Sequence, residues 1–146
     1  MYRLIYKSKP VSTMDWEQVL HILHQSEKNN ETNEITGVLL ASEHSFLQVI
    51  EGRYESVNKL FMTLVHDPRH TDIQLVSFDL IDSRLFAGWG MKGLGLLDFN
   101  TDQVEQLKAK YGEENGDVKF PLEGWKALAL INDLKMMQAL PEWKQS

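Results

Sequence analysis

The sequence predicts an α+β fold of the ferredoxin-like type: a β-α-β-β-α-β-β sheet with two helices on one face and a C-terminal helical cap on the other. Three observations support this prediction. Five short segments have the alternation or apolar runs that are typical of strands. Two segments between them carry apolar residues at helical spacing, and one sheet with two helices on a single face is the ferredoxin-like arrangement. Two more helical patterns follow near the C-terminus and can cover the second face.

The first strand is expected at residues 2–8, where Tyr6 points to one side of the sheet. Ser12 and Thr13 then form an N-cap signal before an acidic first turn, and the helix is expected to run to about Asn30. The inward stripe of this helix consists of Trp16, Val19, Leu20 and Leu23.

A hairpin follows, with strands at residues 34–42 and 45–51 around a tight connection. Residues 54–66 carry apolar side chains at the i, i+3, i+4 spacing of a second amphipathic helix, which a proline ends. The fourth strand is predicted at residues 73–81, and a short fifth strand after Trp89.

The remaining chain is predicted to form two helices separated by a loop. Residues 101–111 and 121–140 have helical patterns, with Pro121 at the first position of the second helix. The segment EENGD at 113–117 is expected to be the loop.

The two C-terminal helices have a specific expected place. Leu47 and Val49 point away from the two main helices, and an exposed apolar sheet face would be a sticky patch. We therefore expect the C-terminal helices to pack over them as a cap, through Val104, Leu107, Trp125, Leu128, Ile131, Leu134 and Met137.

The composition limits the function. The chain has 146 residues, a net charge of −6 and no cysteine, which excludes disulfides and thiolate chemistry and disfavours general nucleic-acid binding. No apolar run approaches a membrane span and no leader is recognisable, so we expect a cytoplasmic protein without membrane attachment. His21 and His24 lack a third ligand at metal spacing, so no metal site is predicted. The sequence contains neither a nucleotide-binding loop nor paired catalytic carboxylates, and we expect a protein that is not an enzyme.

Gln48 is the most unusual residue of the predicted sheet. It lies in FLQVIEG, residues 46–52, between Phe46 and Ile50 on one face of a strand that looks buried on both faces. Its amide brings two donors and an acceptor into an apolar place, and leaving them unpaired costs about 1–3 kcal/mol. We therefore expect Gln48 to have polar partners inside the protein.

The first helix becomes polar on its inner side over the last turn, at Ser26, Asn29 and Asn30. A helix C-cap explains either asparagine alone. The two asparagines and the serine together, with Tyr6 and Gln48 facing the same core, also fit an apolar pocket with a few convergent polar groups. The predicted ligand is uncharged and planar.

Arg69 and His70 follow the second helix. A solvated turn accounts for them, but both can donate hydrogen bonds and Arg69 can bind a phosphate or carbonyl group bidentately. Two functions stay open on the residues alone. One is a small phosphate-handling enzyme of the acylphosphatase type that uses Arg69 and Asn30. The other is a regulatory module that only binds its ligand.

Six short motifs occur in one order along the chain: LIYKS at 4–8, SEKNN at 26–30, ITGVLL at 35–40, FLQVIEG at 46–52, DPRH at 67–70 and FAGWGM at 86–91. In these motifs the chain resembles the BLUF family of flavin-binding blue-light sensors, over residues 2–95. The resemblance implies a photosensor domain at 1–97 and a cap and output extension at 98–146. The fold of this family is the ferredoxin-like one predicted above.

The resemblance implies a photochemical switch made of two residues. Tyr6 would donate an electron to the light-excited flavin, and Gln48 would bridge the tyrosine hydroxyl and the flavin ring. Rotation or tautomerisation of the amide exchanges donor and acceptor without creating net charge, which suits a dry pocket because buried charge is expensive. The shell around Gln48 would consist of Ser26, Trp89 and Met91.

The cofactor implied by the resemblance is a flavin, with FAD favoured over FMN and riboflavin. Asn30 would bind the carbonyl and imide edge of the ring, with Asn29 beside it. Arg69 and His70 would lie near the other carbonyl and the ribityl–phosphate side. No metal is implied.

The chain departs from the family pattern at Gly90, where a larger or polar residue is frequent between the tryptophan and the next position. Gly88 and Gly90 give the chain around Trp89 additional freedom. Nothing beyond residue 95 resembles a cyclase, phosphodiesterase or DNA-binding effector, so the output is expected to go through a partner protein or a homo-oligomer.

Overall fold

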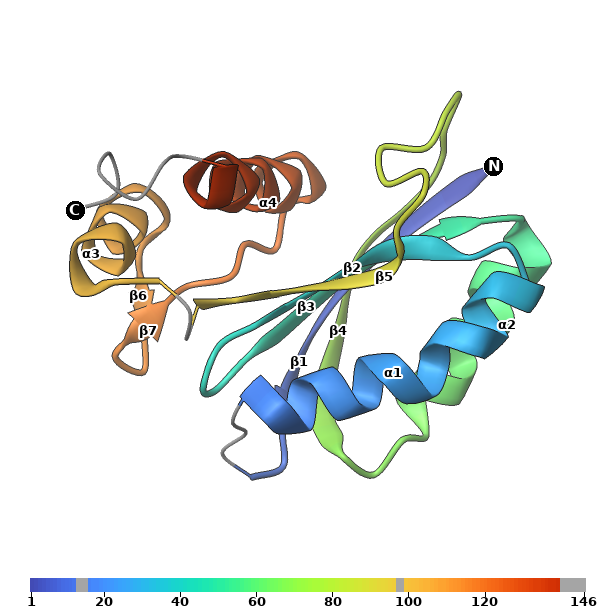
Figure 1. Cartoon of the computed structure of the whole chain (residues 1–146), viewed down its shortest axis with the longest axis horizontal. Helices are drawn as coiled ribbons and strands as arrows, with labels where there is room; N and C mark the ends of the chain where they lie inside the picture. Colours follow the sequence, from blue (N-terminus) through green and yellow to red (C-terminus); the bar gives the residue numbers. More distant parts are fainter. Residues whose placement is uncertain (13–15, 97–98, 140–146) are drawn as a thin grey trace.

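The computed structural model describes residues 1–12, 16–96 and 99–139, and it contains a five-stranded sheet with helices on both faces (Figure 1). In chain order its elements are β1 Tyr2–Pro10, α1 Trp16–Thr32, β2 Thr36–Ala41, β3 Phe46–Gly52, α2 Tyr54–Val65, β4 His70–Leu80, β5 Gly90–Gly95, α3 Thr101–Tyr111, β6 Glu113–Glu114, β7 Asp117–Val118 and α4 Gly124–Ala139. The strand order is β4-β1-β3-β2-β5, with β5 parallel to β2 and the other neighbouring pairs antiparallel. The predicted ferredoxin-like arrangement is confirmed.

Helix α1 occupies the predicted part of the chain, but several predictions about it fall outside the described residues. These are the predicted cap residue Thr13 and the side chains of Trp16, Val19, Leu20, Leu23 and Ser26. At the C-terminal end of the helix the two asparagines differ, because Asn30 is buried and Asn29 is exposed.

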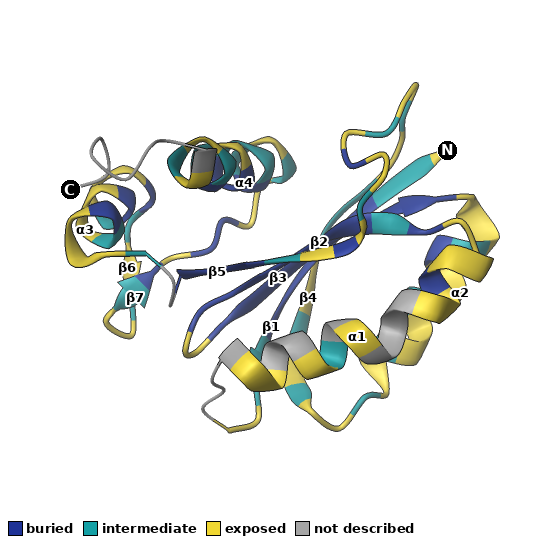
Figure 2. Cartoon of the chain, in the orientation of Figure 1, coloured by how far each residue is buried: buried dark blue, intermediate teal, exposed yellow. Residues whose placement is uncertain are grey.

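The strands send alternate side chains to two apolar clusters on opposite sides of the sheet. Tyr6 and Ile50 belong to the cluster on the side of α1 and α2, which we call the pocket face. Leu47 and Val49 belong to the cluster on the side of α3 and α4, which we call the cap face (Figure 2). From α4 this cluster contains Ala127, Leu130, Ile131 and Leu134. The prediction that the C-terminal helices cover Leu47 and Val49 is therefore confirmed.

Helix α4 begins later than predicted. Pro121 lies before the helix, and the prediction that it occupies the first helical position is wrong. The helix starts at Gly124, which packs so closely on β4 that a Cβ there would lie 2.9 Å from the Ser77 hydroxyl. The start at Gly124 determines which side chains of α4 face the sheet. Trp125 faces outward, with 73% of its surface exposed. The prediction that Trp125 packs on the sheet is also wrong.

Residues 113–118 form a hairpin, whereas the sequence analysis predicts a loop. The short strands β6 and β7 pair antiparallel around Asn115 and Gly116. These two residues have φ angles of 55° and 81°, the positive values that a two-residue hairpin turn requires. The hairpin packs against α3 through β7.

Strand β5 is irregular where it meets the centre of the molecule. Its register with β2 shifts between Gly37 and Val38, so that Gly37 pairs with Gly90 and Val38 with Lys92. Met91 is the extra residue, and its φ angle of 126° is rare for a side chain other than glycine. This bulge places Met91 in the pocket-face cluster.

Candidate functional site

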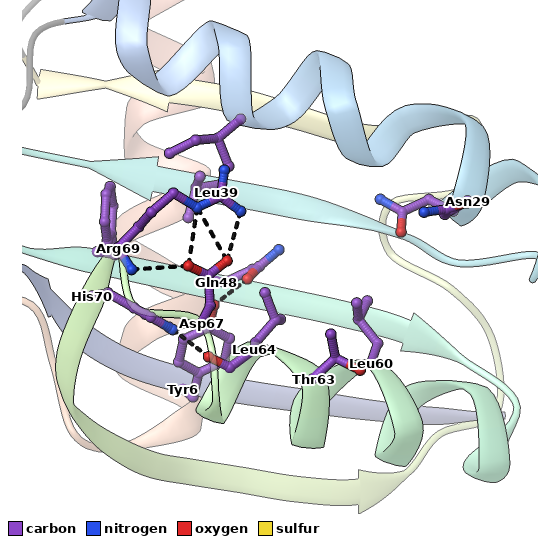
Figure 3. A pocket seen from close by; sticks show the side chains of 13 residues that line it. Tyr6, Asn29, Leu39, Gln48, Leu60, Thr63, Leu64, Asp67, Arg69 and His70 are labelled. Carbon is purple, nitrogen blue, oxygen red and sulfur yellow. Dashed lines mark hydrogen bonds and ion pairs between the residues drawn. The ribbon is translucent and has the colours of Figure 1, made fainter.

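A cavity of about 250 Å³ lies between the pocket face and the two helices α1 and α2 (Figure 3). Polar side chains enter it from the sheet, from the end of α1 and from the turn after α2. The described residues that line it are Tyr6, Ile22, Asn29, Asn30, Leu39, Phe46, Gln48, Leu60, Thr63, Leu64, Asp67, Arg69 and His70. The structure thus brings together six of the predicted site residues, Tyr6, Asn29, Asn30, Gln48, Arg69 and His70.

Gln48 has a partner at each end of its amide. The Tyr6 hydroxyl donates a hydrogen bond to Oε1 of Gln48, and Nε2 of Gln48 donates to the Met91 sulfur at 3.4 Å. Tyr6 and Gln48 stand opposite each other in the β1–β3 register, so the strands themselves set this contact. A thioether is a weak acceptor, and the amide nitrogen therefore keeps its capacity to donate to a better one.

Tyr6 stays protonated under ordinary conditions. Burial raises the pKa of its hydroxyl well above the usual range, and the negative charge of Asp67 raises this pKa further. The hydroxyl is therefore a hydrogen-bond donor to Gln48 and keeps a proton that it can give up.

The two asparagines hold different positions at the cavity. Asn30 is buried, and its Nδ2 donates to the backbone oxygen of Gly90 at 3.2 Å, which ties the end of α1 to the start of β5. Its own backbone oxygen accepts from the Ile35 amide at 2.8 Å. Asn29 also lines the cavity but is exposed. Asn30 is thus a constrained wall residue and Asn29 a residue of the rim.

The turn after α2 places a carboxylate and a guanidinium at the cavity. Asp67 accepts hydrogen bonds from the Arg69 amide at 2.9 Å, from Nε at 3.0 Å and from Nη2 at 2.6 Å. These bonds lower the pKa of Asp67 and raise that of Arg69, so both groups are charged at neutral pH. A phosphate-binding arginine needs its donors directed at the ligand, and the pairing with Asp67 disfavours the acylphosphatase-type reading.

His70 connects the turn to the sheet beside Tyr6. Its Nε2 lies 2.5 Å from the Leu64 backbone oxygen, and its Nδ1 lies 2.8 Å from the Ser8 hydroxyl. Because a carbonyl oxygen only accepts, Nε2 carries a hydrogen, and Nδ1 can accept from Ser8. The ring of His70 also meets the Tyr6 ring edge-on, at 6.0 Å between centroids.

The three predicted shell residues of Gln48 have different outcomes. Met91 contacts Gln48 as expected. Trp89 does not, because it packs on the cap-face cluster beside Phe86, with the Lys92 and Lys135 ammonium groups 4.7 and 4.8 Å from its ring centre. The bulge at Met91 separates the two side chains onto opposite faces of the sheet. The side chain of Ser26 lies outside the described residues.

Sequence reasoning missed Asp67 and Ser8 as parts of the site. In the sequence analysis Asp67 appears only as the first residue of the DPRH motif. The signal that could have revealed it is the spacing in DPRH, because an aspartate two residues before another backbone amide forms an Asx-turn. Ser8 shares the face of Tyr6 by strand periodicity, but nothing in the sequence indicates its bond to His70.

Two further features of the described residues bear on function. No group of three or more histidine, aspartate or glutamate side chains among them is arranged to hold a metal ion. Within the same part of the chain, no helix has the length and apolar character needed to span a membrane.

Comparison with known proteins agrees with this geometry. Residues 1–92 match the family model BLUF, described as sensors of blue light using FAD. The chain is 29% identical over 119 residues to the blue light- and temperature-regulated antirepressor BluF of Escherichia coli, covering 82% of this chain and 28% of that protein.

Solved structures give the same result. A structure named BlsA photo-activated state matches with a TM-score of 0.73 and 28% identity, over 91% of this chain and 93% of that one. A bacterial light-regulated adenylyl cyclase matches with a TM-score of 0.67 and 34% identity, over 75% of this chain and 32% of that one. The chain spans less than a third of the curated relatives that it matches. On the match of its first 92 residues, the chain belongs to the BLUF family of blue-light sensors that use a flavin.

Proposed function

We propose that the cavity binds the ring system of a flavin, with FAD as the flavin, and that Tyr6 and Gln48 form its light-driven switch. The observation that carries this proposal is the chain of contacts from the Tyr6 hydroxyl through the Gln48 amide to the Met91 sulfur at the cavity wall. The amide is held in place, yet one of its two partners is weak. Such a group can change partners at low cost.

The residues of the cavity fit a flavin ring by their chemistry. A flavin ring is planar and uncharged, with carbonyl and imide groups along one edge, and the cavity offers the amides of Asn29, Asn30 and Gln48 beside apolar walls. We assign the ring edge to Asn30, with Asn29 beside it. Arg69 and His70 would lie toward the other carbonyl and the ribityl–phosphate side. Asn29 and Arg69 are exposed where they line the cavity, so the nucleotide part of FAD would extend past them into solvent.

The switch follows from the properties of the two residues. Bound flavin supplies a chromophore that becomes an oxidant on blue-light excitation. Tyr6 gives up one electron and passes its hydroxyl proton to Oε1 of Gln48, which accepts its hydrogen bond. When the electron and a proton return to Tyr6, Gln48 remains rotated or tautomerised, with its donor and acceptor ends exchanged. A new hydrogen bond from Gln48 to a ring carbonyl would shift the absorption slightly to the red.

Met91 and Ser26 are assigned to the shell of Gln48, and Trp89 to signal output. Met91 accepts from the amide in the present arrangement, so a turned amide releases it. Met91 belongs to β5, and Trp89, which directly precedes this strand, contacts the cap. Ser26 keeps the role that the family resemblance implies.

Residues 1–97 are proposed as the sensor domain and residues 98–146 as the output extension. Lys135 of α4 lies 4.8 Å from the ring centre of Trp89 and 5.9 Å from that of Phe86, which gives the segment just before β5 a direct contact with the cap. A shift of β5 would thus be transmitted to α4. The relatives include subunits of photoactivated adenylate cyclases, and this chain matches 9% of the length of such a subunit from Euglena gracilis. We propose a sensor role for the residues of this chain and assign no enzymatic chemistry to them.

The output is proposed to pass to a protein partner, with a second copy of this chain as the first candidate. The outer side of α4 exposes 73% of Trp125 and 60% of Met136, eleven residues or three turns apart. In an antiparallel pair of α4 helices, Trp125 of each copy would meet Met136 of the other, a favourable sulfur–aromatic contact. Nucleic acids and membranes are not proposed as partners, since the net charge is −6.

The decisive experiment is an absorption spectrum of the purified protein before and during blue illumination. The expected result is a yellow protein whose spectrum shifts reversibly to the red. A protein that binds flavin without a light-induced shift would support the alternative of a ligand-binding module without light chemistry. A colourless protein that does not take up added flavin would refute the proposal.

A further inference from the structure

Asp67 is the one carboxylate among the described residues that line the cavity. It is half-buried, and its two oxygens accept hydrogen bonds from the Arg69 backbone amide and from Nε and Nη2 of the Arg69 guanidinium. The turn after α2 therefore fixes the position of a negative charge in the cavity wall (Figure 3). The bonds from Arg69 lower the pKa of the carboxyl group, so it stays ionised at neutral pH.

The charge of Asp67 acts on Tyr6. Both side chains line the same cavity, and the carboxylate raises the pKa of the buried Tyr6 hydroxyl in addition to the effect of burial. Burial of Tyr6 reduces the screening of this interaction by water. A negative charge that opposes loss of a proton by a phenol favours loss of an electron when the electron leaves before the proton, because the oxidised phenol then carries a positive charge.

We propose that Asp67 is a positioning residue for the photochemistry, which holds a fixed negative charge beside Tyr6 and so makes Tyr6 a better electron donor. Arg69 limits this effect by partly neutralising the carboxylate. The inference rests on the proposed function, in which Tyr6 first loses one electron to the excited flavin and then its proton to Gln48. Asp67 itself neither gains nor loses a proton in the step.

A purely structural role for Asp67 predicts different behaviour. Its oxygen accepts from the Arg69 amide and closes the turn at the end of α2. Asparagine has a side-chain oxygen at the same place and can close the same turn, but it carries no charge. Asp67→Asn therefore removes the charge and keeps the turn, whereas Asp67→Glu keeps the charge.

The first test measures the electrostatic effect without light. A fluorinated tyrosine with a lower intrinsic pKa replaces Tyr6 in the full flavin-bound chain, and its ionisation is followed by ¹⁹F NMR. Asp67→Asn is expected to lower its pKa by about one unit, a ten-fold change in the ionisation constant. Arg69→Gln should raise this pKa. Asp72→Asn is the matched control, because Asp72 is an exposed carboxylate near Lys9, and it should change nothing.

The second test measures electron loss from Tyr6 as the decay time of the excited flavin. Asp67→Asn is expected to lengthen this decay by about three- to ten-fold, which corresponds to up to about 1.4 kcal/mol in the barrier. Asp67→Glu should largely restore the parent value, and Asp72→Asn should equal it.

The outcomes separate the two levels of inference. If Tyr6→Phe leaves the decay unchanged, Tyr6 is not the donor and the proposed function fails. If Tyr6→Phe lengthens the decay while Asp67→Asn changes neither the titration nor the decay, the role of Asp67 is refuted and the proposed function stands. If Asp67→Asn does not fold, the titration of Arg69→Gln decides, since an unchanged or lowered pKa there contradicts the inference.

Discussion

The two faces of the sheet bury polar groups of different kinds. Among the described residues, the buried polar side chains on the pocket side of the sheet are uncharged, namely Tyr6, Ser8, Asn30 and Gln48. On the cap face two charged side chains are buried, Lys7 at 3% exposure and Glu51 at 0%. Consecutive residues of β1, such as Tyr6 and Lys7, serve the two faces in alternation.

The difference matches what each face has to do. Neutral groups can exchange hydrogen-bond partners in a dry interior without exposing net charge, so the pocket face can have two states of similar energy. A buried charge is costly to separate from its partners, so the cap face resists rearrangement at Lys7 and Glu51. Glu51 accepts from Arg3 Nε at 2.8 Å and from the amides of Phe86 and Leu85 at 2.9 and 3.1 Å. Lys7 donates to the Phe120 backbone oxygen at 3.0 Å.

The largest expected effect is a complete loss of the photoshift in Gln48→Leu. Leucine fills a similar volume but cannot exchange donor and acceptor, so flavin should still bind while the reversible red shift disappears. The measurement is a light-minus-dark difference spectrum, with Tyr6→Phe as a second variant that lacks the hydroxyl. A normal photoshift in Gln48→Leu would show that Gln48 is not part of the mechanism. It would also contradict the view that neutral groups on the pocket face switch between two states.

On the cap face the largest effect should be on stability. Glu51→Ala leaves Arg3 and two backbone amides without their acceptor, and breaking a buried charged pair costs about 3–5 kcal/mol. Chemical denaturation of the parent and the variant measures this loss. Glu51→Gln, which keeps an acceptor oxygen, should lose less. A loss below about 1 kcal/mol in Glu51→Ala would show that the buried charge does not stabilise this face.

Asn30 and Asn29 compare a buried and an exposed amide at the cavity. Asn30→Ala should weaken flavin binding by about ten- to a hundred-fold, because a buried hydrogen bond is worth about 1–3 kcal/mol. Asn29→Ala should have a smaller effect, since water can replace the exposed amide. Fluorescence titration with flavin gives both affinities, and equal values in the two variants and the parent would contradict the assignment.

Alkaline pH provides a test of Tyr6 that needs no light. Its raised pKa favours the protonated form in the folded state, so the contribution to stability is complete below the ordinary tyrosine pKa of about 10. Above that pH Tyr6 should lower the free energy of unfolding by about 1.4 kcal/mol per pH unit, because the unfolded chain releases a proton that the Tyr6 hydroxyl of the folded chain keeps. Denaturation at several pH values should show a shallower decline in Tyr6→Phe. If the free energy of unfolding declines equally with pH in the parent and in Tyr6→Phe, the pKa of Tyr6 is not raised in the folded state.

The smallest expected effect concerns the contact between Lys135 and Trp89. Lys135→Met keeps much of the side-chain volume but removes a cation–π contact worth about 0.5–2 kcal/mol. The expected result is a reduced difference in hydrogen exchange between dark and illuminated protein over residues 95–139. If the parent itself shows no light-dependent exchange in this range, the cap does not carry the signal.

The sequence predicts the sheet and its two faces well, because strand periodicity decides which side chains share a face. Tyr6 and Gln48 meet for this reason, and Leu47 and Val49 lie under the cap for the same reason. Helix α3 agrees with its predicted bounds, since Asn100 and Gln103 form a reciprocal capping box at its start.

Other features depend on geometry that periodicity cannot supply. The bulge at Met91 breaks the alternation along β5, and the side on which Trp89 packs therefore could not be predicted. The start of α4 depends on the close packing of Gly124 on Ser77, which joins residues far apart in the sequence. The Asn115–Gly116 turn, by contrast, carries the sequence signature of a two-residue hairpin, and predicting a loop there overlooked it.

The edge position of β5 affects the free energy that its local opening requires. Strand β5 has one hydrogen-bonded neighbour in the sheet, whereas β1, β3 and β2 each have two. Local opening of β5 breaks a single ladder, and regions with fewer such bonds open at lower free energy than the whole fold. The strand that contacts both Gln48 and the cap is thus among the parts of the sheet that open at the lowest free energy. Its amide hydrogens should exchange through local fluctuations, whereas those of β3 should exchange only through global unfolding.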